Sequence, residues 1–312
     1  MISKPNNKAS NVHFVIHANE RTLPIAGLCL SYFDKYCGLD NINISVIGNR
    51  FLTKELPYSD KVNYISPDID FDDGGSHFSP VLAKACKEIA EDYVFFFCED
   101  YMLIDNIDLD GLDKLVKLMV GDNVDMFSFA SNQPIINNYQ KYENSVKYGF
   151  NENDIYYVWD GYMYQYSVQP CLWRKSSLLD LLNYNPTLRL HHLDTSHIKG
   201  KTGTYRTIDH SGPVQKYVGW SERDKYNHKI LCPSQMIFDY YPQAGEKFII
   251  NYIEVLKSGK FILPSNSRLA EDNRVVQLIY KIIDENNLKS DPNFNRYFQW
   301  VYTSHLLQYP KG

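Results

Sequence analysis

The chain has 312 residues, of which 44% are hydrophobic and 22% are charged, and its formal net charge is −5. This length and balance exclude a disordered chain and suit one large α/β domain, alone or with a smaller appendage. The acidic charge provides no global basic field. It therefore argues against a protein that coats nucleic acid or an anionic membrane, and leaves only a local basic patch open.

The six cysteines are scattered, mostly among apolar neighbours, and none forms a CxxC pair. This usage predicts reduced core residues rather than a zinc site or a disulfide framework. The segment MISKPNNKASN lacks the apolar core of a signal peptide, and no apolar run approaches the roughly 20 residues that span a bilayer. We therefore expect a cytoplasmic protein without a membrane partner.

Up to Ala130 the chain alternates between strand-like and helix-like patterns. Strands are predicted at Val12–His17, Ile42–Ile47, Lys61–Ile65, Val124–Ala130 and from Tyr93 to the acids at 99 and 100. Helices are predicted over Leu23–Tyr36, after the N-cap Ser79 with Pro80, and from the cap Asp110 to Gly121. This alternation predicts a doubly wound, mostly parallel sheet.

The second half of the chain has weaker patterns. We expect a long polar loop at Asn132–Asn153, cleft-lining strands at Asp154–Pro170 and a helix at Lys175–Leu182. Two further helices are predicted at Ala244–Leu256 and Arg274–Ile283. The predicted organisation is a catalytic domain over residues 1–240 and a mainly helical C-terminal appendage over residues 241–312.

The most informative stretch is YVFFFCEDYMLID, where an apolar run from Tyr93 stops at Glu99 and Asp100. Such a run predicts a central strand covered on both faces, and ligands of open α/β sheets bind outside the carboxyl ends of such strands. Adjacent acids repel each other unless a cation, a sugar hydroxyl or a basic side chain compensates them. The alternative is that both acids cap the next helix or lie in solvent.

Four segments in order resemble nucleotide-sugar-dependent glycosyltransferases of the GT-A fold, particularly small bacterial and viral ones. They are VIHANERTLPIAGLCLSYFDKY, AEDYVFFFCEDYMLID, YSVQPCLWRKSSLLDLL and LRLHHLDTSHI. The second is similar to the strand that ends in a DxD-type motif, and the third to a Q-x-x-x-W-[RK]-x-x-L-L element. Together they span about Val12 to His197, and the C-terminal third matches no pattern of the family.

The resemblance implies a GT-A-like fold and transfer of a hexosyl or pentosyl group from a nucleotide-diphosphate sugar, UDP-sugar first, to an acceptor hydroxyl. It implies a divalent cation, Mn²⁺ or Mg²⁺, on Asp100, with His210 as a second metal candidate. The chain departs from the family at Tyr101, where the last acid of the motif usually stands. Either Asp100 takes over as ligand, or Arg, Lys and His side chains stabilise the leaving diphosphate instead.

The resemblance also implies roles for other positions. It places nucleotide contacts at Asn19, Glu20, Arg21 and Glu99. For Asn19, Glu20 and Arg21 the alternative is a solvated turn. Sugar or acceptor contacts are expected among Ser76, His77, Trp159, Asp160, Gln169 and Trp173. For Trp173 packing in the core is favoured over a sugar contact. A helix N-terminus after Gly74-Gly75 is suited to phosphate or sugar.

The candidate catalytic residues are Asp100, which would act on the leaving group, and Asp194, which would act as base. Asp194 stands among His191, His192 and His197 and is suited to deprotonating the acceptor hydroxyl of an inverting transfer. The alternative is that Asp194 caps a short helix that begins at Thr195.

The acceptor is either a glycan or, alternatively, a hydroxymethylated pyrimidine in DNA. The DNA alternative depends on seven basic residues between positions 199 and 229 that could follow a phosphate backbone, namely Lys199, Lys201, Arg206, Lys216, Arg223, Lys225 and Lys229. A nucleotidyltransferase is a second enzyme class, but HANERTLP lacks the glycine expected of a phosphate loop. A protein that binds nucleotides or carbohydrates without catalysis is the third alternative.

Overall fold

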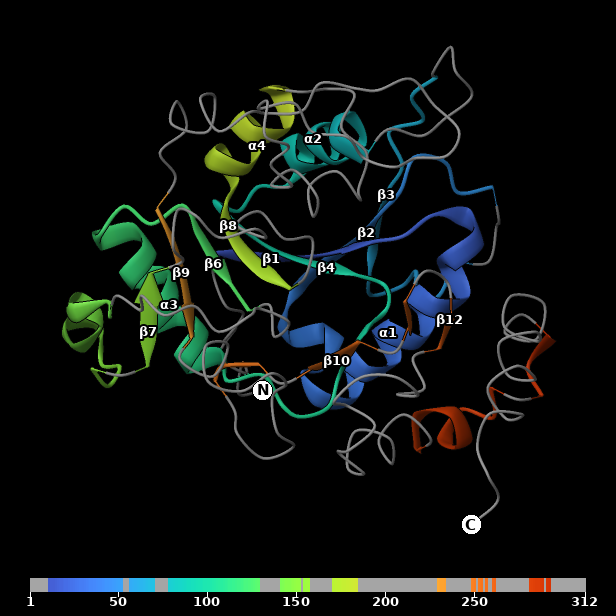
Figure 1. The fold of residues 1–312 in the computed structure, drawn as a ribbon. Helices are drawn as coiled ribbons and strands as arrows, with labels where there is room; N and C mark the ends of the chain where they lie inside the picture. Colours follow the sequence, from blue (N-terminus) through green and yellow to red (C-terminus); the bar gives the residue numbers. More distant parts are fainter. Residues whose placement is uncertain are drawn as a thin grey trace, which may run out of the picture.

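The computed structural model describes a large part of the first 184 residues and shorter segments after them (Figure 1). The described residues are 11–52, 56–70, 78–129, 141–152, 154–157, 170–184, 229–233, 248–250, 252–254, 256–257, 260–261, 281–288 and 290–292. Among them, no helix is both long and apolar enough to cross a membrane.

Within the described residues the main sheet has eight strands in the order β3-β2-β1-β4-β8-β6-β9-β7. They are β1 (Val12–His17), β2 (Asn43–Ile47), β3 (Asn63–Ile65), β4 (Tyr93–Cys98), β6 (Met126–Ser128), β7 (Ile155–Tyr157), β8 (Cys171–Arg174) and β9 (Ile230–Pro233). Strands β3, β2, β1 and β4 are parallel, β8 is antiparallel to both β4 and β6, and β7 is antiparallel to β9. The prediction of a mostly parallel sheet is confirmed.

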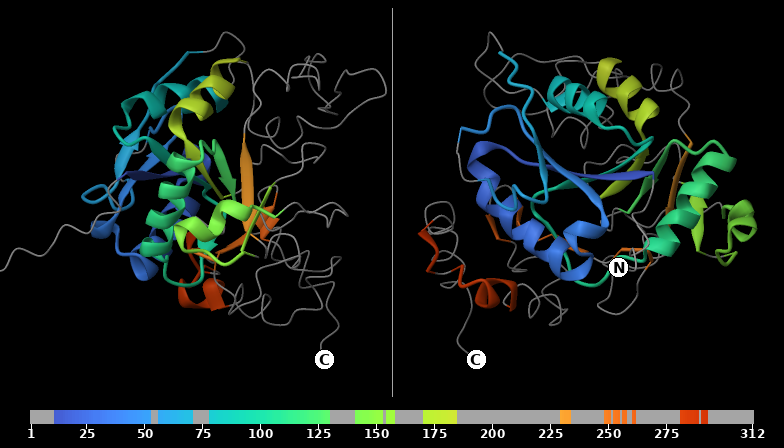
Figure 2. Two further views of the ribbon diagram at one scale, coloured as in Figure 1. Left: turned by 90° about the vertical axis from the view of Figure 1, so that its left-hand side faces the viewer. Right: turned by 180° about the vertical axis from the view of Figure 1, so that it is seen from behind.

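Helices cover both faces of this sheet. They are α1 (Leu23–Tyr36), α2 (Phe78–Glu88), α3 (Leu109–Gly121) and α4 (Lys175–Tyr184), with short 3-10 helices η1 (Glu20–Thr22), η2 (Leu39–Asn41) and η3 (Glu143–Tyr148). Figures 1 and 2 show α2 and α4 side by side on one face and α1 and α3 on the other. The sheet is therefore doubly wound, as the alternation of patterns predicts.

The core is built around β4, whose six residues are all buried. On the α1 face, Phe33 makes edge contacts with Phe14 and Phe97, at ring-centroid distances of 5.9 and 5.1 Å. On the α2 face, Phe78 contacts Phe96 in the same way at 5.9 Å. Because side chains of a strand alternate between faces, only a continuous apolar run can fill both sides of a covered strand. The central position of the Tyr93 strand is thus confirmed.

Both predicted N-caps are wrong, because each helix begins two residues earlier than predicted. Helix α2 begins at Phe78, so Ser79 lies inside it with a buried hydroxyl that has no hydrogen-bond partner among the described residues. Helix α3 is capped by Asp108, whose carboxylate accepts a hydrogen bond from the Gly111 amide at 3.0 Å. An N-cap oxygen has to reach the amide two or three residues later, and Asp108 is the acid placed to do so.

The predicted helix at Ala244–Leu256 is wrong where the structure describes it. Residues 252–254 form β10, which pairs antiparallel with β5 (Tyr101–Leu103), and β11 (Leu256–Lys257) pairs with β12 (Lys260–Phe261). Ile249, Ile250 and Tyr252 are buried in the core of the first 184 residues. An unpaired β5 offers backbone groups to the apolar segment, and this pairing overrides the helical spacing of the sequence.

Other C-terminal predictions are tested only in part. Residues 281–285 are helical, in agreement with the end of the helix predicted at Arg274–Ile283, and Ile282 and Ile283 are buried. Asn286 donates a hydrogen bond to the hydroxyl of Tyr32 on α1 at 3.2 Å. The boundary predicted near residue 240 lies outside the described residues.

The predicted polar loop at Asn132–Asn153 is described only from residue 141 onward, and there it is packed rather than irregular. It holds η3, and Tyr142 is fully buried. The hydroxyls of Tyr142 and Tyr148 both donate to Asp122 at the end of α3. The strands predicted at Asp154–Pro170 are confirmed for β7, and residues 158–169 lie outside the described part.

Candidate functional site

The order of the strands defines where a ligand is expected to bind. From β1 the chain adds β2 and β3 on one side, and it then crosses to place β4 on the other side of β1. The carboxyl ends of β1 and β4 are neighbours, with His17 opposite Cys98. Such a reversal of strand order opens a crevice outside the carboxyl ends of the strands, where ligands of open α/β sheets bind.

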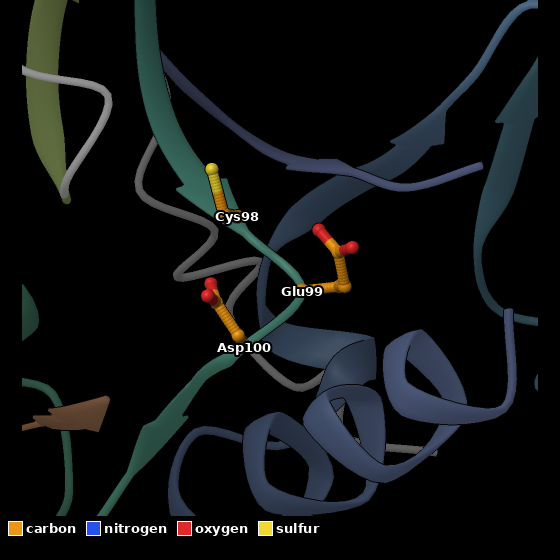
Figure 3. Close-up of side chains that lie close together, drawn as sticks. All are labelled: Cys98, Glu99 and Asp100. Carbon is orange, nitrogen blue, oxygen red and sulfur yellow. The ribbon is translucent and has the colours of Figure 1, made fainter. Parts of the chain in front are cut away.

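The turn that leaves β4 carries the two carboxylates at this point. We call Glu99 and Asp100 the acidic turn; it joins β4 to β5, and both residues are partly buried. Figure 3 shows their side chains with that of Cys98, and one ligand atom from each of the three lies within 4.8 Å of the others. Carboxylate oxygens suit Mg²⁺ or Mn²⁺, whereas a thiol suits softer metals. The chemistry of the two acids therefore fits a hard divalent cation.

The carboxyl group of Glu99 is in an unusual electrostatic environment. Burial raises its pKa to about 7, although hydrogen bonds with its own backbone amide and with the Thr22 side chain oppose the rise. In the described part of the chain, no lysine or arginine pairs with this group. A positive charge bound at the acidic turn would favour the ionised form, so the site is suited to a cation.

The turn after β1 is held in one shape by its own hydrogen bonds. The Asn19 amide donates to the Thr22 hydroxyl at 2.9 Å, and the Thr22 amide donates to the Asn19 side-chain oxygen at 3.2 Å. The carboxylate of Glu20 accepts a hydrogen bond from the Leu52 amide at 2.9 Å, which ties this turn to the segment after β2. The structure thus brings Asn19 and Glu20 to the same sheet edge as Glu99 and Asp100.

Segments after β2 and β3 form the next part of this edge. Asn49 bonds to both backbone groups of Ile69, and Arg50 pairs with Asp68 and Asp70. Gly48 is required by a close approach, because a Cβ atom there would lie 2.4 Å from the carbonyl oxygen of Ala18. The sequence marks Gly48-Asn49 as a turn but gives no signal for the pairing of Arg50.

Tyr101, at the position where the family usually has the last acid, is packed in the core. Its side chain is only 6% exposed and makes an edge contact with Tyr252, with ring centroids 5.4 Å apart. Its backbone carbonyl accepts a hydrogen bond from the thiol of Cys29 on α1 at 3.2 Å. Burial, followed by the charges of Glu99 and Asp100, raises the pKa of Cys29, so the thiol remains protonated and can donate. The sequence gives no signal for this contact.

Trp173 and Arg174, the Trp-Arg pair of the Q-x-x-x-W-[RK]-x-x-L-L element, stabilise the fold. Trp173 is 2% exposed, and its indole N–H donates to the sulfur of Cys171 at 3.1 Å. We therefore withdraw Trp173 as a sugar contact, because a ring enclosed on both faces offers no surface to a ligand. Arg174 donates to the carbonyl of Met119 in the last turn of α3 at 3.0 Å and to that of Val124, in the segment after the helix, at 3.2 Å.

The remaining candidates lie outside the described residues and stay predictions. They are Ser76, His77, Trp159, Asp160, Gln169, Asp194 and His210, together with the side chain of Arg21. Of the basic residues between 199 and 229, the structure describes Lys229. Its ammonium group donates to the Asp122 carbonyl at 3.1 Å and the Tyr142 hydroxyl at 3.2 Å, so it holds the fold together.

Comparisons with known proteins gave structural neighbours only. No family model and no curated protein matches the chain. For TarS from S. aureus in complex with UDP-GlcNAc, the identity is 13% and the TM-score 0.36, over 55% of this chain and 47% of that chain. For the mannosyltransferase PcManGT from Pyrobaculum calidifontis, in complex with GDP-Man and Mn²⁺, the identity is 12% and the TM-score 0.35. That match covers 58% of this chain and 50% of that chain.

A third neighbour is a cytidylyltransferase from Leptospira borgpetersenii, at 13% identity and a TM-score of 0.40, over 89% of this chain and 95% of that chain. The chain spans about half the length of the TarS and PcManGT structures that it matches. The structural neighbours are thus GT-A glycosyltransferases and cytidylyltransferases, at low identity.

Proposed function

We propose that this protein is a glycosyltransferase that moves a sugar from a nucleotide-diphosphate sugar, UDP-sugar first, to an acceptor hydroxyl. The observation that carries the proposal is the position of Glu99 and Asp100. They follow the buried central strand, beside the turn after β1, where the strand order reverses. A nucleotide whose diphosphate lies at the acidic turn would place its base and ribose near Asn19 and Glu20.

The chemistry of the transfer accounts for acids at this place. Breaking the anomeric C–O bond leaves negative charge on the diphosphate, which the site has to neutralise. A divalent cation bound to Glu99 and Asp100 would supply that neutralisation. Of the two alternatives that Tyr101 leaves open, we propose the cation, because Glu99 and Asp100 lie together and carboxylate oxygens are the ligands that a hard divalent metal prefers.

The acceptor side of the proposal depends on residues outside the described part. Asp194 remains the proposed base for the acceptor hydroxyl, and Trp159, Asp160 and Gln169 remain proposed sugar or acceptor contacts. A glycan is the first acceptor to test, since Lys229, one member of the basic cluster behind the DNA alternative, is held against Asp122 and Tyr142.

A thermal-shift panel of nucleotide sugars, each with and without Mn²⁺, tests the donor and the cation together. A ligand that binds only the folded protein raises its melting temperature with concentration. We expect one UDP-sugar to raise it in a Mn²⁺-dependent manner, and slow release of UDP in the absence of acceptor. Nucleoside triphosphates that stabilise the protein and yield pyrophosphate with a sugar phosphate would instead show a nucleotidyltransferase.

Binding without any release of UDP, over long incubation and with a broad panel of acceptor glycans, would favour the non-catalytic alternative. Transfer to hydroxymethylated duplex DNA, with binding that weakens as salt rises, would identify the DNA alternative.

A further inference from the structure

Helix α1 contacts the acidic turn at two points. Thr22, at the start of the helix, bonds through its side chain to the carboxyl group of Glu99. Cys29 is seven residues further along, which is two turns of an α-helix, so both residues lie on the same face. Its thiol donates to the carbonyl oxygen of Tyr101, the residue directly after the acidic turn.

We propose that Cys29 is a positioning residue, which fixes the acidic turn against α1 so that Glu99 and Asp100 are held where ligand binding requires them. The contact joins residues 72 positions apart at 3.2 Å, and Cys29 is fully buried. The contact fixes the end of the turn that lies outside the main sheet, since Cys98 at the other end belongs to β4.

The backbone that follows the acidic turn is also held from the side opposite to α1. Strand β5 pairs with β10, with Tyr101 opposite Glu254, and the ring of Tyr101 packs against Tyr252. The backbone after Asp100 is therefore clamped between α1 on one side and β10 on the other. A shift of about 1 Å in a group that positions a substrate can lower a rate a hundredfold. A single hydrogen bond at this point is thus enough to matter for function.

The test compares Cys29→Ala, which removes the donor, with Cys29→Ser, which keeps one. Cys86→Ala is the matched control, because Cys86 is also a fully buried thiol on a helix, but on α2, across the sheet from α1. The first readout is hydrogen exchange of peptides covering residues 99–103 in the protein without ligand. We expect Cys29→Ala to speed this exchange about fivefold, the equivalent of one ordinary hydrogen bond. Cys86→Ala should leave it unchanged, and Cys29→Ser should restore it.

The second readout rests on the proposed function. Binding of Mn²⁺ and of the stabilising UDP-sugar, measured by calorimetry, should weaken about fivefold in Cys29→Ala and recover in Cys29→Ser. Wild-type exchange at residues 99–103 in a folded Cys29→Ala variant would overturn the positioning role, whatever the activity. Equal effects of Cys29→Ala and Cys86→Ala on exchange there would overturn it as well. If Cys29→Ala speeds the exchange but the wild-type protein binds no nucleotide sugar, the proposed function is refuted and the positioning role of Cys29 stands.

Discussion

Asp100 is the residue on which the proposed chemistry depends most directly. It follows Glu99 at the end of the central strand, and one of its carboxylate oxygens lies within 4.8 Å of a carboxylate oxygen of Glu99 and of the thiol sulfur of Cys98. Asp100→Ala should lower turnover by at least about a hundredfold, because removing a group that stabilises developing charge costs a few kcal/mol of barrier. Steady-state kinetics measure this. Asp113→Ala, which removes an exposed carboxylate from α3, is the control and should turn over normally.

A folded Asp100→Ala enzyme with near-normal kinetics would remove this residue from the site. If Glu99 contacts the donor, Glu99→Ala should weaken donor binding more than it slows the chemical step. A pure effect on kcat would reverse the two assignments.

Asp194 carries the second prediction at this scale. If it is the base of an inverting transfer, Asp194→Asn should keep its affinity for the donor and lose transfer by roughly two to four orders of magnitude, the usual contribution of a general base. Donor titrations and transfer assays on the same preparation separate the two effects. A helix cap predicts no change, since Asn caps about as well as Asp. In that event Asp160 and Asp209 are the next candidates.

At the scale of elements, Arg174 connects β8 to the end of α3. Its guanidinium donates to the Met119 carbonyl in the last turn of α3 and, in the segment that follows, to the Val124 carbonyl and the Asn123 side chain. Arg174→Ala should lower the free energy of unfolding by about 2 kcal/mol, because charged hydrogen bonds to the end of a helix are lost. Urea unfolding measures this loss. Arg174→Lys should recover only part of it, since an ammonium group cannot reproduce the fork of donors.

The affinity of Arg174→Ala for the donor should equal that of the wild type. A loss of donor binding without a loss of stability would contradict the structural role and return this motif to the ligand site.

A polar relay at the far end of the sheet links two strands, β1 and β2, and the segment before β4. His13 on β1 bonds through Nε2 to the Ser45 hydroxyl on β2 at 2.7 Å, and through Nδ1 to the Glu91 carboxylate before β4 at 3.0 Å. Ser45 is fully buried, so no substrate can reach its hydroxyl. Burial lowers the pKa of His13, while the nearby Glu91 opposes that change. The net effect is a pKa of His13 below its ordinary value.

This relay predicts a dependence of stability on pH. Because the pKa of His13 is lower in the folded protein, the unfolded chain binds more protons below about pH 6.5, and stability falls as the pH drops. Urea unfolding at pH 7.5 and 5.5 should show this loss in the wild type. In His13→Gln the loss over this window should be much smaller, even though the variant is less stable overall. An equal pH dependence in both proteins would assign it to other groups.

At the scale of the whole molecule, the described residues between 248 and 254 are part of the main core. The strand β10 pairs with β5, Tyr252 donates from its hydroxyl to the Phe129 carbonyl, and Ile249 and Ile250 are buried. Truncation after residue 240 should therefore destabilise the protein by several kcal/mol, since burying one large apolar side chain contributes about 1.5–3 kcal/mol. Calorimetric melting of the purified fragment checks this.

Tyr252→Phe removes only the hydroxyl group and its hydrogen bond. It should lower the free energy of unfolding by only about 1 kcal/mol. A truncated protein that melts at the wild-type temperature would show instead that residues beyond 240 form a separate appendage.

The sequence by itself determined the features that depend on local periodicity. The apolar run of β4 predicts a covered central strand, and the alternation up to Ala130 predicts the doubly wound sheet, because burial on one or two faces leaves a repeat in the chain. The acidic turn follows from the same pattern, since the run stops at Glu99 and Asp100. These predictions need no knowledge of which strands become neighbours.

Only the tertiary structure decided the contacts between distant segments. The reversal of strand order beside β1, the Cys29 contact and the packing of Trp173 join residues far apart in the sequence, and no local repeat encodes them. The segment at 252–254 became a strand because β5 offered it unpaired backbone groups, although its apolar spacing also suits a helix. Short apolar segments have similar energies in either form, so the partner available in the folded molecule determines which one is adopted.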